Sequence, residues 1–207
     1  MRAGGGIMVS FYVPWRDAST AHGVNTALAV AVADAIRATT GVQVGLKWPN
    51  DVVIQHGADY MRKLAGILAE LVTDGNEVLG VIAGLGLNVS WPSDEDIASA
   101  PEDLGGAIAL DDVAGESVHR ERLAASIVSH FDDELSRLAG GEVAGLRARY
   151  EQLCSTVGCE VRIQGIHESF EGRAVGVDES GALLVDVAGV RRSVIAGDVV
   201  HVRNAGT

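Results

Sequence analysis

Three apolar runs in the first ninety residues predict strands. They lie at residues 7–13, 63–72 and 77–84; the first is rich in β-branched side chains, and the last continues to Val89. The run at 63–72 is apolar on both faces, which is typical of a central strand. Asp74-Gly75-Asn76 predicts a tight turn between the second and third runs. We therefore expect a sheet, with the polar residues 55–61 as a hairpin loop.

Apolar residues recur at helical spacing in three segments. The first extends from Ser19 or Thr20, either of which can cap a helix, to Thr39. The second and third cover residues 121–138 and 142–153. Helices combined with strands predict an α/β (α+β) protein with a mixed sheet. The acidic stretch 91–112 contains proline and shows no period, so we expect a surface loop there.

The pattern changes after Gly158. Five short predicted strands follow at tight spacing, separated by turn residues, at 160–163, 169–177, 183–187, 191–195 and 199–202. Five strands in so short a stretch predict a small β-barrel. We place the domain boundary near Thr156, which divides the chain into residues 1–156 and 157–207.

Composition narrows the function classes. The chain has 207 residues, a net charge of −12 and 47% hydrophobic residues, so a nucleic-acid surface is disfavoured and a substantial core is expected. No apolar run reaches the length of a membrane span, and the N-terminus resembles no signal peptide. Cys154 and Cys159 lack the second ligand pair of a zinc site, and His119 and His130 have no paired ligand nearby. These features favour a cytoplasmic protein with reduced thiols.

One stretch has features of a substrate-binding or catalytic site: Lys47-Trp48-Pro49-Asn50-Asp51. Pro49 fixes its own φ and favours an extended Trp48, while Asn50 and Asp51 have turn chemistry. A lysine at the end of a buried strand, on a stiff turn, holds an ammonium group where an anionic substrate can be stabilised. An ordinary hairpin turn with a solvated lysine is the alternative.

Glycines in the third strand mark a second candidate. Gly84-x-Gly86 lacks the third glycine and the following helix of a dinucleotide-binding fingerprint. Glycines inside a strand more often allow close approach of a ligand or another backbone. Asn88 just beyond them could bind a phosphate or a hydrated metal, or could simply end the strand.

Three motifs in order carry a family resemblance. Lys47-Trp48-Pro49-Asn50-Asp51 is followed by residues 63–70, Lys-Leu-Ala-Gly-Ile-Leu-Ala-Glu, and residues 84–89, Gly-Leu-Gly-Leu-Asn-Val. Together they resemble the biotin protein ligases, the biotin–[acetyl-CoA-carboxylase] ligase family. The resemblance implies a catalytic domain over residues 1–156 and an SH3-like domain over residues 157–207. It also implies that biotin and MgATP form biotinyl-5′-AMP, from which biotin passes to a lysine of a biotin carboxyl carrier protein.

The same resemblance assigns roles to residues. Lys47 would be the catalytic residue and would contact both the biotin carboxylate and the phosphate. Trp48, Gly66, Gly84 and Gly86 would line the biotin and adenylate site. On the nucleotide side the resemblance places Lys63 and Asn88, with Asn88 an indirect ligand of Mg²⁺.

One departure from the family is clear. The Gly-Arg-Gly-Arg loop that covers biotin is absent, so the chain resembles a ligase that lacks its N-terminal part. A truncated, non-catalytic module that binds nucleotide or carrier protein is therefore an alternative, as is a lipoate-ligase-like acyltransferase. We further expect a monomer or weak homodimer, with no DNA or membrane partner.

Overall fold

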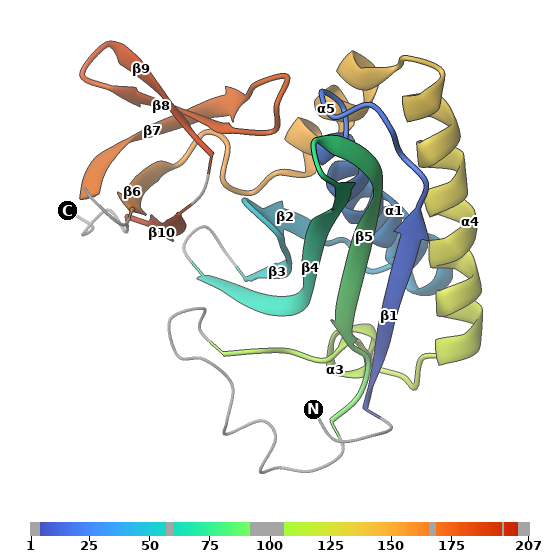
Figure 1. The fold of residues 1–207 in the computed structure, drawn as a ribbon. Coiled ribbons are helices and arrows are strands. Elements are labelled where there is room, and N and C mark those ends of the chain that lie inside the picture. Colours follow the sequence, from blue (N-terminus) through green and yellow to red (C-terminus); the bar gives the residue numbers. More distant parts are fainter. Residues whose placement is uncertain (1–4, 57–59, 92–105, 166–168, 196, 203–207) are drawn as a thin grey trace, which may run out of the picture.

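The computed structural model describes residues 5–56, 60–91, 106–165, 169–195 and 197–202. Within them the chain forms two antiparallel sheets, the larger of which carries a layer of helices (Figure 1). The elements are β1 (Gly6–Val13), α1 (His22–Thr40), β2 (Gly45–Lys47), β3 (Asp51–His56), β4 (Tyr60–Asp74), β5 (Glu77–Asn88), α3 (Leu110–Ala114), α4 (Arg120–Ala139), α5 (Val143–Leu153), β6 (Glu160–Gln164), β7 (Ser169–Val177), β8 (Leu183–Val187), β9 (Val190–Val194) and β10 (Asp198–His201). This confirms the predicted α+β class. None of these helices is both long and apolar enough to cross a lipid bilayer.

The larger sheet has the strand order β1-β5-β4-β3-β2. Its named strands pair antiparallel, and among the described residues parallel pairing is limited to two isolated bridges, Leu46 with Cys154 and Lys63 with Ala107. The long strand β4 lies at the centre, as its apolar sequence predicts. The sheet is therefore almost entirely antiparallel rather than evenly mixed in direction.

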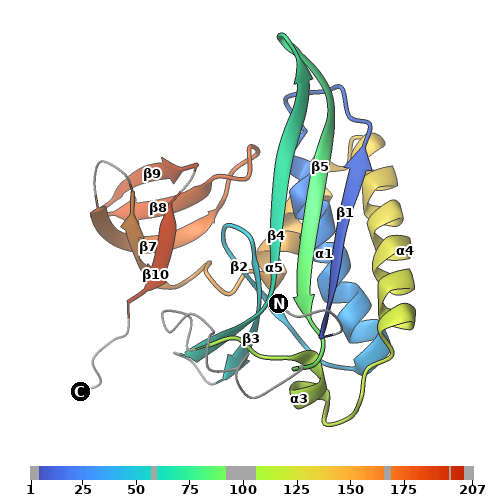
Figure 2. The same cartoon turned by 60° about the horizontal axis from the view of Figure 1, so that its bottom comes forward.

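The two faces of this sheet differ in their side chains. On β5, Ala83, Leu85 and Leu87 are buried and alternate with Gly84 and Gly86, which point to the opposite face. Helices α1, α4 and α5 lie on the side of the buried residues (Figure 2). The face that carries the glycines is not covered by a described helix, and it is the face on which a ligand can lie.

Helix α1 packs tightly because its buried positions are mostly alanine and valine. It begins at His22, so the predicted cap by Ser19 or Thr20 is wrong. Both hydroxyl groups instead donate hydrogen bonds to the Asp17 carboxylate, at 2.6 and 2.9 Å, and Ala21 occupies the cap position. At the other end, Gly41 adopts the left-handed conformation of a helix C-terminus.

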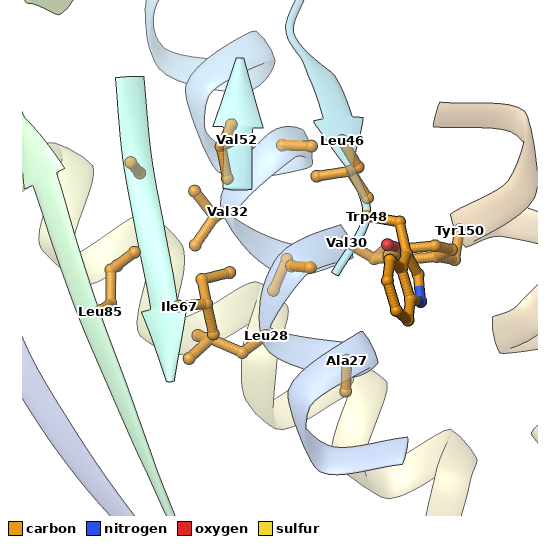
Figure 3. Close-up of a cluster of buried hydrophobic side chains, with 14 of the residues drawn as sticks. Ala27, Leu28, Val30, Val32, Leu46, Trp48, Val52, Ile67, Leu85 and Tyr150 are labelled. Atoms are coloured by element: carbon orange, nitrogen blue, oxygen red, sulfur yellow. The ribbon is translucent and has the colours of Figure 1, made fainter. Parts of the chain in front are cut away.

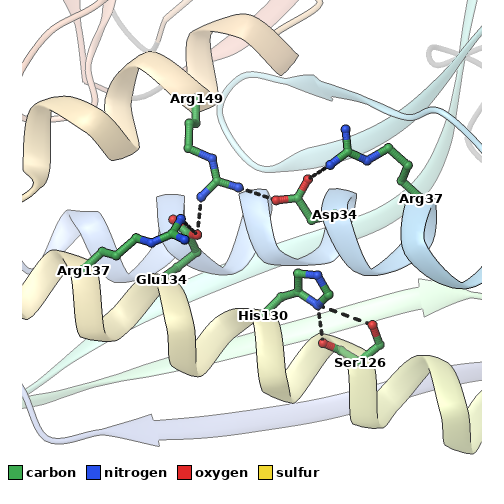
Figure 4. Close-up of polar contacts among 7 residues, drawn as sticks. All are labelled: Asp34, Arg37, Ser126, His130, Glu134, Arg137 and Arg149. Atoms are coloured by element: carbon green, nitrogen blue, oxygen red, sulfur yellow. Dashed lines mark hydrogen bonds and ion pairs between the residues drawn. The ribbon is translucent and has the colours of Figure 1, made fainter.

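Charged side chains tie the three long helices together (Figure 4). Arg149 of α5 forms ion pairs with Asp34 of α1 and Glu134 of α4. Arg37 and Arg137 supply a second partner to each carboxylate, both at 3.0 Å. Glu134 is only 4% exposed, so these pairs compensate the cost of burying its charge.

The smaller sheet has the order β10-β6-β7-β8-β9 and its own apolar centre. Val161, Leu183 and Val185 are fully buried within it. The segment that leads into it, from Cys154 to Thr156, pairs with the end of β2 in the larger sheet. Neither Cys154 nor Cys159 forms a disulfide bond in the structure.

Two loop predictions need correction. The polar residues 55–61 do not form a loop throughout, because Gln55 pairs with Met61 and extends the hairpin of β3 and β4. Strand β3 lies next to the edge strand β2, and the remaining loop residues 57–59 lie outside the described part of the chain. In the predicted loop 91–112, the short helix α3 begins at Leu110, and residues 92–105 lie outside the described part of the chain.

Candidate functional site

Glycines form the floor of a cavity on the open face. Gly66 of β4 lies directly opposite Gly86 of β5, and Gly84 lies opposite Leu68. The cavity has a volume of about 490 Å³ and is lined by Met8, Val9, Ser10, Asn50, Gly66, Ile67, Leu68, Gly84, Leu85 and Gly86. A Cβ atom at Gly86 would meet no atom within 4 Å. The structure therefore brings the three predicted glycines together, and among the described residues no atom fills the space above Gly86.

The predicted lysine stands at one end of this floor. Register partners on neighbouring strands form one row across the sheet: Lys47, Asp51, Gly66, Gly86 and Met8. Paired residues share a face of a sheet, so Lys47 and Asp51 lie on the same face as the glycines.

Lys63 approaches the same carboxylate from β4. Its Nζ atom forms an ion pair with Asp51 Oδ1 at 2.5 Å. A Cβ atom on Gly66 would lie 3.3 Å from both Cε and Nζ of Lys63, so the ammonium group lies against the glycine floor. Lys47 and Lys63 are the only lysines of the sequence. Lys63 is thus the ion-pair partner of Asp51 and Lys47 its register neighbour, so both lysines of a chain whose net charge is −12 belong to the strands around this carboxylate.

Trp48 is oriented differently from Lys47. The residue is 3% exposed, and its ring lies in the helix-side core beside Tyr150 (Figure 3). The indole Nε1 donates a hydrogen bond to Gly181 O at 3.0 Å, and the backbone N–H donates to Thr156 Oγ1 at 3.2 Å. The Trp48–Pro49 peptide bond is cis. These contacts fix the turn that carries Lys47.

A second cavity of about 500 Å³ lies behind this turn. It is bounded by Trp48, the beginning of α1, helix α5 and the segment 177–181, and it shares Asn50, Ile67 and Leu68 with the first cavity. Trp48 lines this second cavity and is not among the residues that line the glycine floor.

Asn88 continues the row of alternate residues that begins with Gly84 and Gly86. It ends β5 opposite Gly6, on the open face. The described residues contain no group of three His, Cys, Asp or Glu side chains arranged to hold a metal ion. His130, a histidine without a paired metal ligand nearby in the sequence, places its Nδ1 atom 2.8 Å from Ser126 O (Figure 4). A single amide suits a magnesium ion that arrives bound to phosphates, because Mg²⁺ is often held by few protein ligands together with substrate phosphates.

Sequence reasoning missed three residues of this site. It treated Asp51 as a turn residue only, although the alternation along β3 places it on the open face beside both lysines. Thr156 was taken only as a boundary marker, yet its hydroxyl group reaches the Lys47 turn. His201 was not singled out, although burial and, to a lesser degree, the charge of Lys47 lower its pKa to about 4.

Two family models match the sequence. Residues 1–88 match the biotin/lipoate A/B protein ligase family, and residues 156–202 match the biotin protein ligase C-terminal domain. The chain therefore combines a domain of the biotin/lipoate A/B protein ligase family with a biotin protein ligase C-terminal domain, and the smaller sheet is this SH3-like C-terminal domain.

Individual relatives agree with this assignment. A biotin–[acetyl-CoA-carboxylase] ligase from Mycobacterium tuberculosis is 32% identical over 185 residues, which cover 87% of this chain and 62% of that protein. A bifunctional ligase/repressor BirA from Bacillus spizizenii is 29% identical over 171 residues, or 83% and 50% of the two chains. The chain thus spans about half to three-fifths of the length of these relatives.

Solved structures share the fold. The biotin protein ligase of Aquifex aeolicus superposes with a TM-score of 0.79 at 22% identity, covering 96% of this chain and 83% of that one. Its complex with biotin and ATP gives a TM-score of 0.76 at 23% identity, covering 97% and 79%.

Proposed function

We propose that this chain carries the adenylating and transferring site of a biotin protein ligase. The observation that supports this most directly is the row from Lys47 through Asp51 to Gly66 and Gly86. It combines a flat floor for a ligand with the only two lysines of the sequence. Biotin and ATP are the proposed substrates, in keeping with the complex of the Aquifex aeolicus protein.

The first step joins two anions. A carboxylate oxygen of biotin attacks the α-phosphorus of ATP, a phosphorus–oxygen bond to pyrophosphate breaks, and biotinyl-5′-AMP forms. Lys47, as the catalytic residue, lowers the repulsion between the two partners and aligns them. Its compact, mobile ammonium group suits a reaction in which both partners move.

We assign Lys63 a larger role in substrate binding than the nucleotide-side position predicted from the sequence. Its ammonium group lies against Gly66, so a ligand on the glycine floor would contact it directly. Asp51 is the counter-charge of Lys63 and the cross-strand neighbour of Lys47, and it fixes where the two cations stand. Trp48 supports the turn, while Gly66, Gly84 and Gly86 form the biotin and adenylate surface.

In the second step, the neutral amine of a lysine on the carrier domain attacks the acyl carbon of the adenylate. An amide forms, AMP leaves, and the amine proton passes to solvent. On the nucleotide side we place Asn88 near the phosphates of MgATP, with magnesium brought in as part of the substrate. A biotin carboxyl carrier protein in the cytoplasm remains the proposed partner, and residues 1–156 and 157–207 the proposed domains.

The complete reaction can be followed by mass. The chain is mixed with biotin, MgATP and an apo carrier domain, and the carrier is weighed by mass spectrometry. We expect one added biotinyl group, lost when Lys47 is replaced by alanine and retained in Arg122→Ala. Arg122 is an exposed residue of α4 and serves as a matched loss of one positive charge. A chain that binds biotinyl-AMP without modifying the carrier would instead support the non-catalytic module.

A further inference from the structure

The backbone on both sides of Lys47 is held by one segment that follows α5. Ser155 N–H donates to Leu46 O at 2.8 Å, and Leu46 pairs with Cys154 in a parallel bridge. On the other side, Trp48 N–H donates to Thr156 Oγ1 at 3.2 Å. The residues on either side of Lys47 are therefore each hydrogen-bonded to one of two consecutive residues, Ser155 and Thr156.

Thr156 is an unusual residue at this point. It is 0% exposed, and in the described part of the chain the only other buried polar residue is Glu134, which is 4% exposed. A buried hydroxyl group needs its hydrogen bonds satisfied. Thr156 Oγ1 accepts from Trp48 and lies 3.3 Å from His201 Nε2. A threonine hydroxyl has one donor and two acceptor positions, so it can donate to an unprotonated Nε2 while accepting from Trp48.

His201 belongs to the C-terminal sheet. It is the last residue of β10, where it pairs with Val161 of β6. Its half-buried ring lies close enough to Lys47 for the charge of that lysine to lower its pKa, and it is neutral at pH 7. A neutral ring can accept the Thr156 proton, and it adds no second positive charge next to Lys47.

We propose that Thr156 and His201 are positioning residues for Lys47. The contact runs from His201 on β10, through the Thr156 hydroxyl group, to the backbone of Trp48 directly after the lysine. In this way the C-terminal sheet sets the place of the ammonium group in the candidate site. The kinetic consequence rests on the proposed ligase function, whereas the positioning itself does not.

The sequence offers a clean test, because Lys47 and Lys63 are its only side-chain amines. A small amine-acylating reagent is applied to the folded chain, and the labelling rates of Lys47 and Lys63 are compared by peptide mass spectrometry. Lys63 serves as an internal reference in the same molecule. We expect Thr156→Val and His201→Phe each to change the Lys47-to-Lys63 ratio at least threefold. Thr156→Ser and His201→Gln, which keep a polar partner, should restore it.

A general loosening of the fold would change both rates together, and this outcome would overturn the proposal. An unchanged ratio in folded His201→Phe would overturn it as well, and that variant remains informative if Thr156→Val fails to fold. Arg162→Ala is the matched control on the neighbouring strand β6, where an exposed pair with Glu171 is lost.

Kinetics separate this proposal from the proposed function. In biotin-dependent exchange of pyrophosphate into ATP, Thr156→Val and His201→Phe should each lower kcat by about 10-fold or more. Misplacing a reacting group by an ångström costs up to about 100-fold in rate. The KM for biotin should change little. A shifted labelling ratio in a chain without exchange activity would uphold the positioning and reject the ligase function. Normal exchange activity together with an unchanged labelling ratio in these variants would uphold the ligase function and reject the positioning role.

Discussion

Lys63 Nζ lies 2.5 Å from Asp51 Oδ1, and this pair joins β3 to β4 at the edge of the glycine floor. The side chain of Asp51 is only 12% exposed, whereas that of Lys63 is 34% exposed. The carboxylate is therefore shielded from water and directed at the open face. It is the ion-pair partner of Lys63 and the cross-strand neighbour of Lys47.

Asp51→Asn should weaken both stability and substrate alignment. The change keeps the shape of the side chain but leaves Lys47 and Lys63 without their shared carboxylate. Because Lys63 is partly solvated, we expect a loss of roughly 1–2 kcal/mol in the free energy of unfolding. Urea titration of the folded chain measures this. An unchanged unfolding midpoint would mean that the pair contributes nothing to the fold.

Gly86→Val should weaken ligand binding without disrupting the fold. No atom lies within 4 Å of a Cβ atom at Gly86, so the new side chain fits and projects into the cavity. We expect biotin affinity, measured by calorimetry, to fall at least about 10-fold because the floor is no longer flat. Gly145→Ala on α5 is the control, since its Cβ also meets nothing within 4 Å. Equal biotin affinity in both variants would place the ligand elsewhere.

Arg149→Met should destabilise the helix layer. The substitution leaves Asp34 and Glu134 with one arginine each, Arg37 and Arg137, and Glu134 is buried. We expect the free energy of unfolding to fall by about 2–3 kcal/mol, below the full cost of an unpaired buried charge. Arg122→Met, at an exposed position of the same helix layer, should cost far less. Similar unfolding midpoints for the two variants would contradict a structural role for the network.

His201 should make stability depend on pH. Burial and the charge of Lys47 lower its pKa from 6.5 to about 4 in the folded chain. Between these values the unfolded chain binds a proton that the folded chain does not, so stability falls as the pH falls. After allowing for partial exposure, we expect a loss of about 1 kcal/mol between pH 7 and pH 5 that is absent in His201→Gln. Parallel losses in the two proteins would argue against a buried, neutral ring.

The sequence predicts the central part of the fold because local signals agree there. Apolar alternation places Gly84, Gly86 and Asn88 on one face, and the turn after Lys47 follows from Pro49 and its neighbours. The cap of α1 was predicted wrongly because Ser19 and Thr20 have a nearer partner in Asp17. Local propensity cannot rank such competing hydrogen bonds.

The site was less predictable, because its contacts join distant parts of the chain. The pairing of Lys63 with Asp51 depends on the β3–β4 register, which contains an irregularity between Val52 and Val53. The contact between Trp48 and Thr156 spans 108 positions, and no local pattern indicates it. The orientation of Trp48 toward Tyr150 depends on how α5 packs, which the sequence alone does not determine.

The central claim is that Lys47, on the open glycine face, makes adenylate formation possible. The most direct test is to incubate the chain with biotin and MgATP and to measure biotinyl-5′-AMP by mass spectrometry, in the wild type, Lys47→Ala and Arg122→Ala. We expect Lys47→Ala to form adenylate at least about 100-fold more slowly, because it loses a preorganised charge, while Arg122→Ala matches the wild type. Adenylate formation at the wild-type rate in Lys47→Ala would contradict this account.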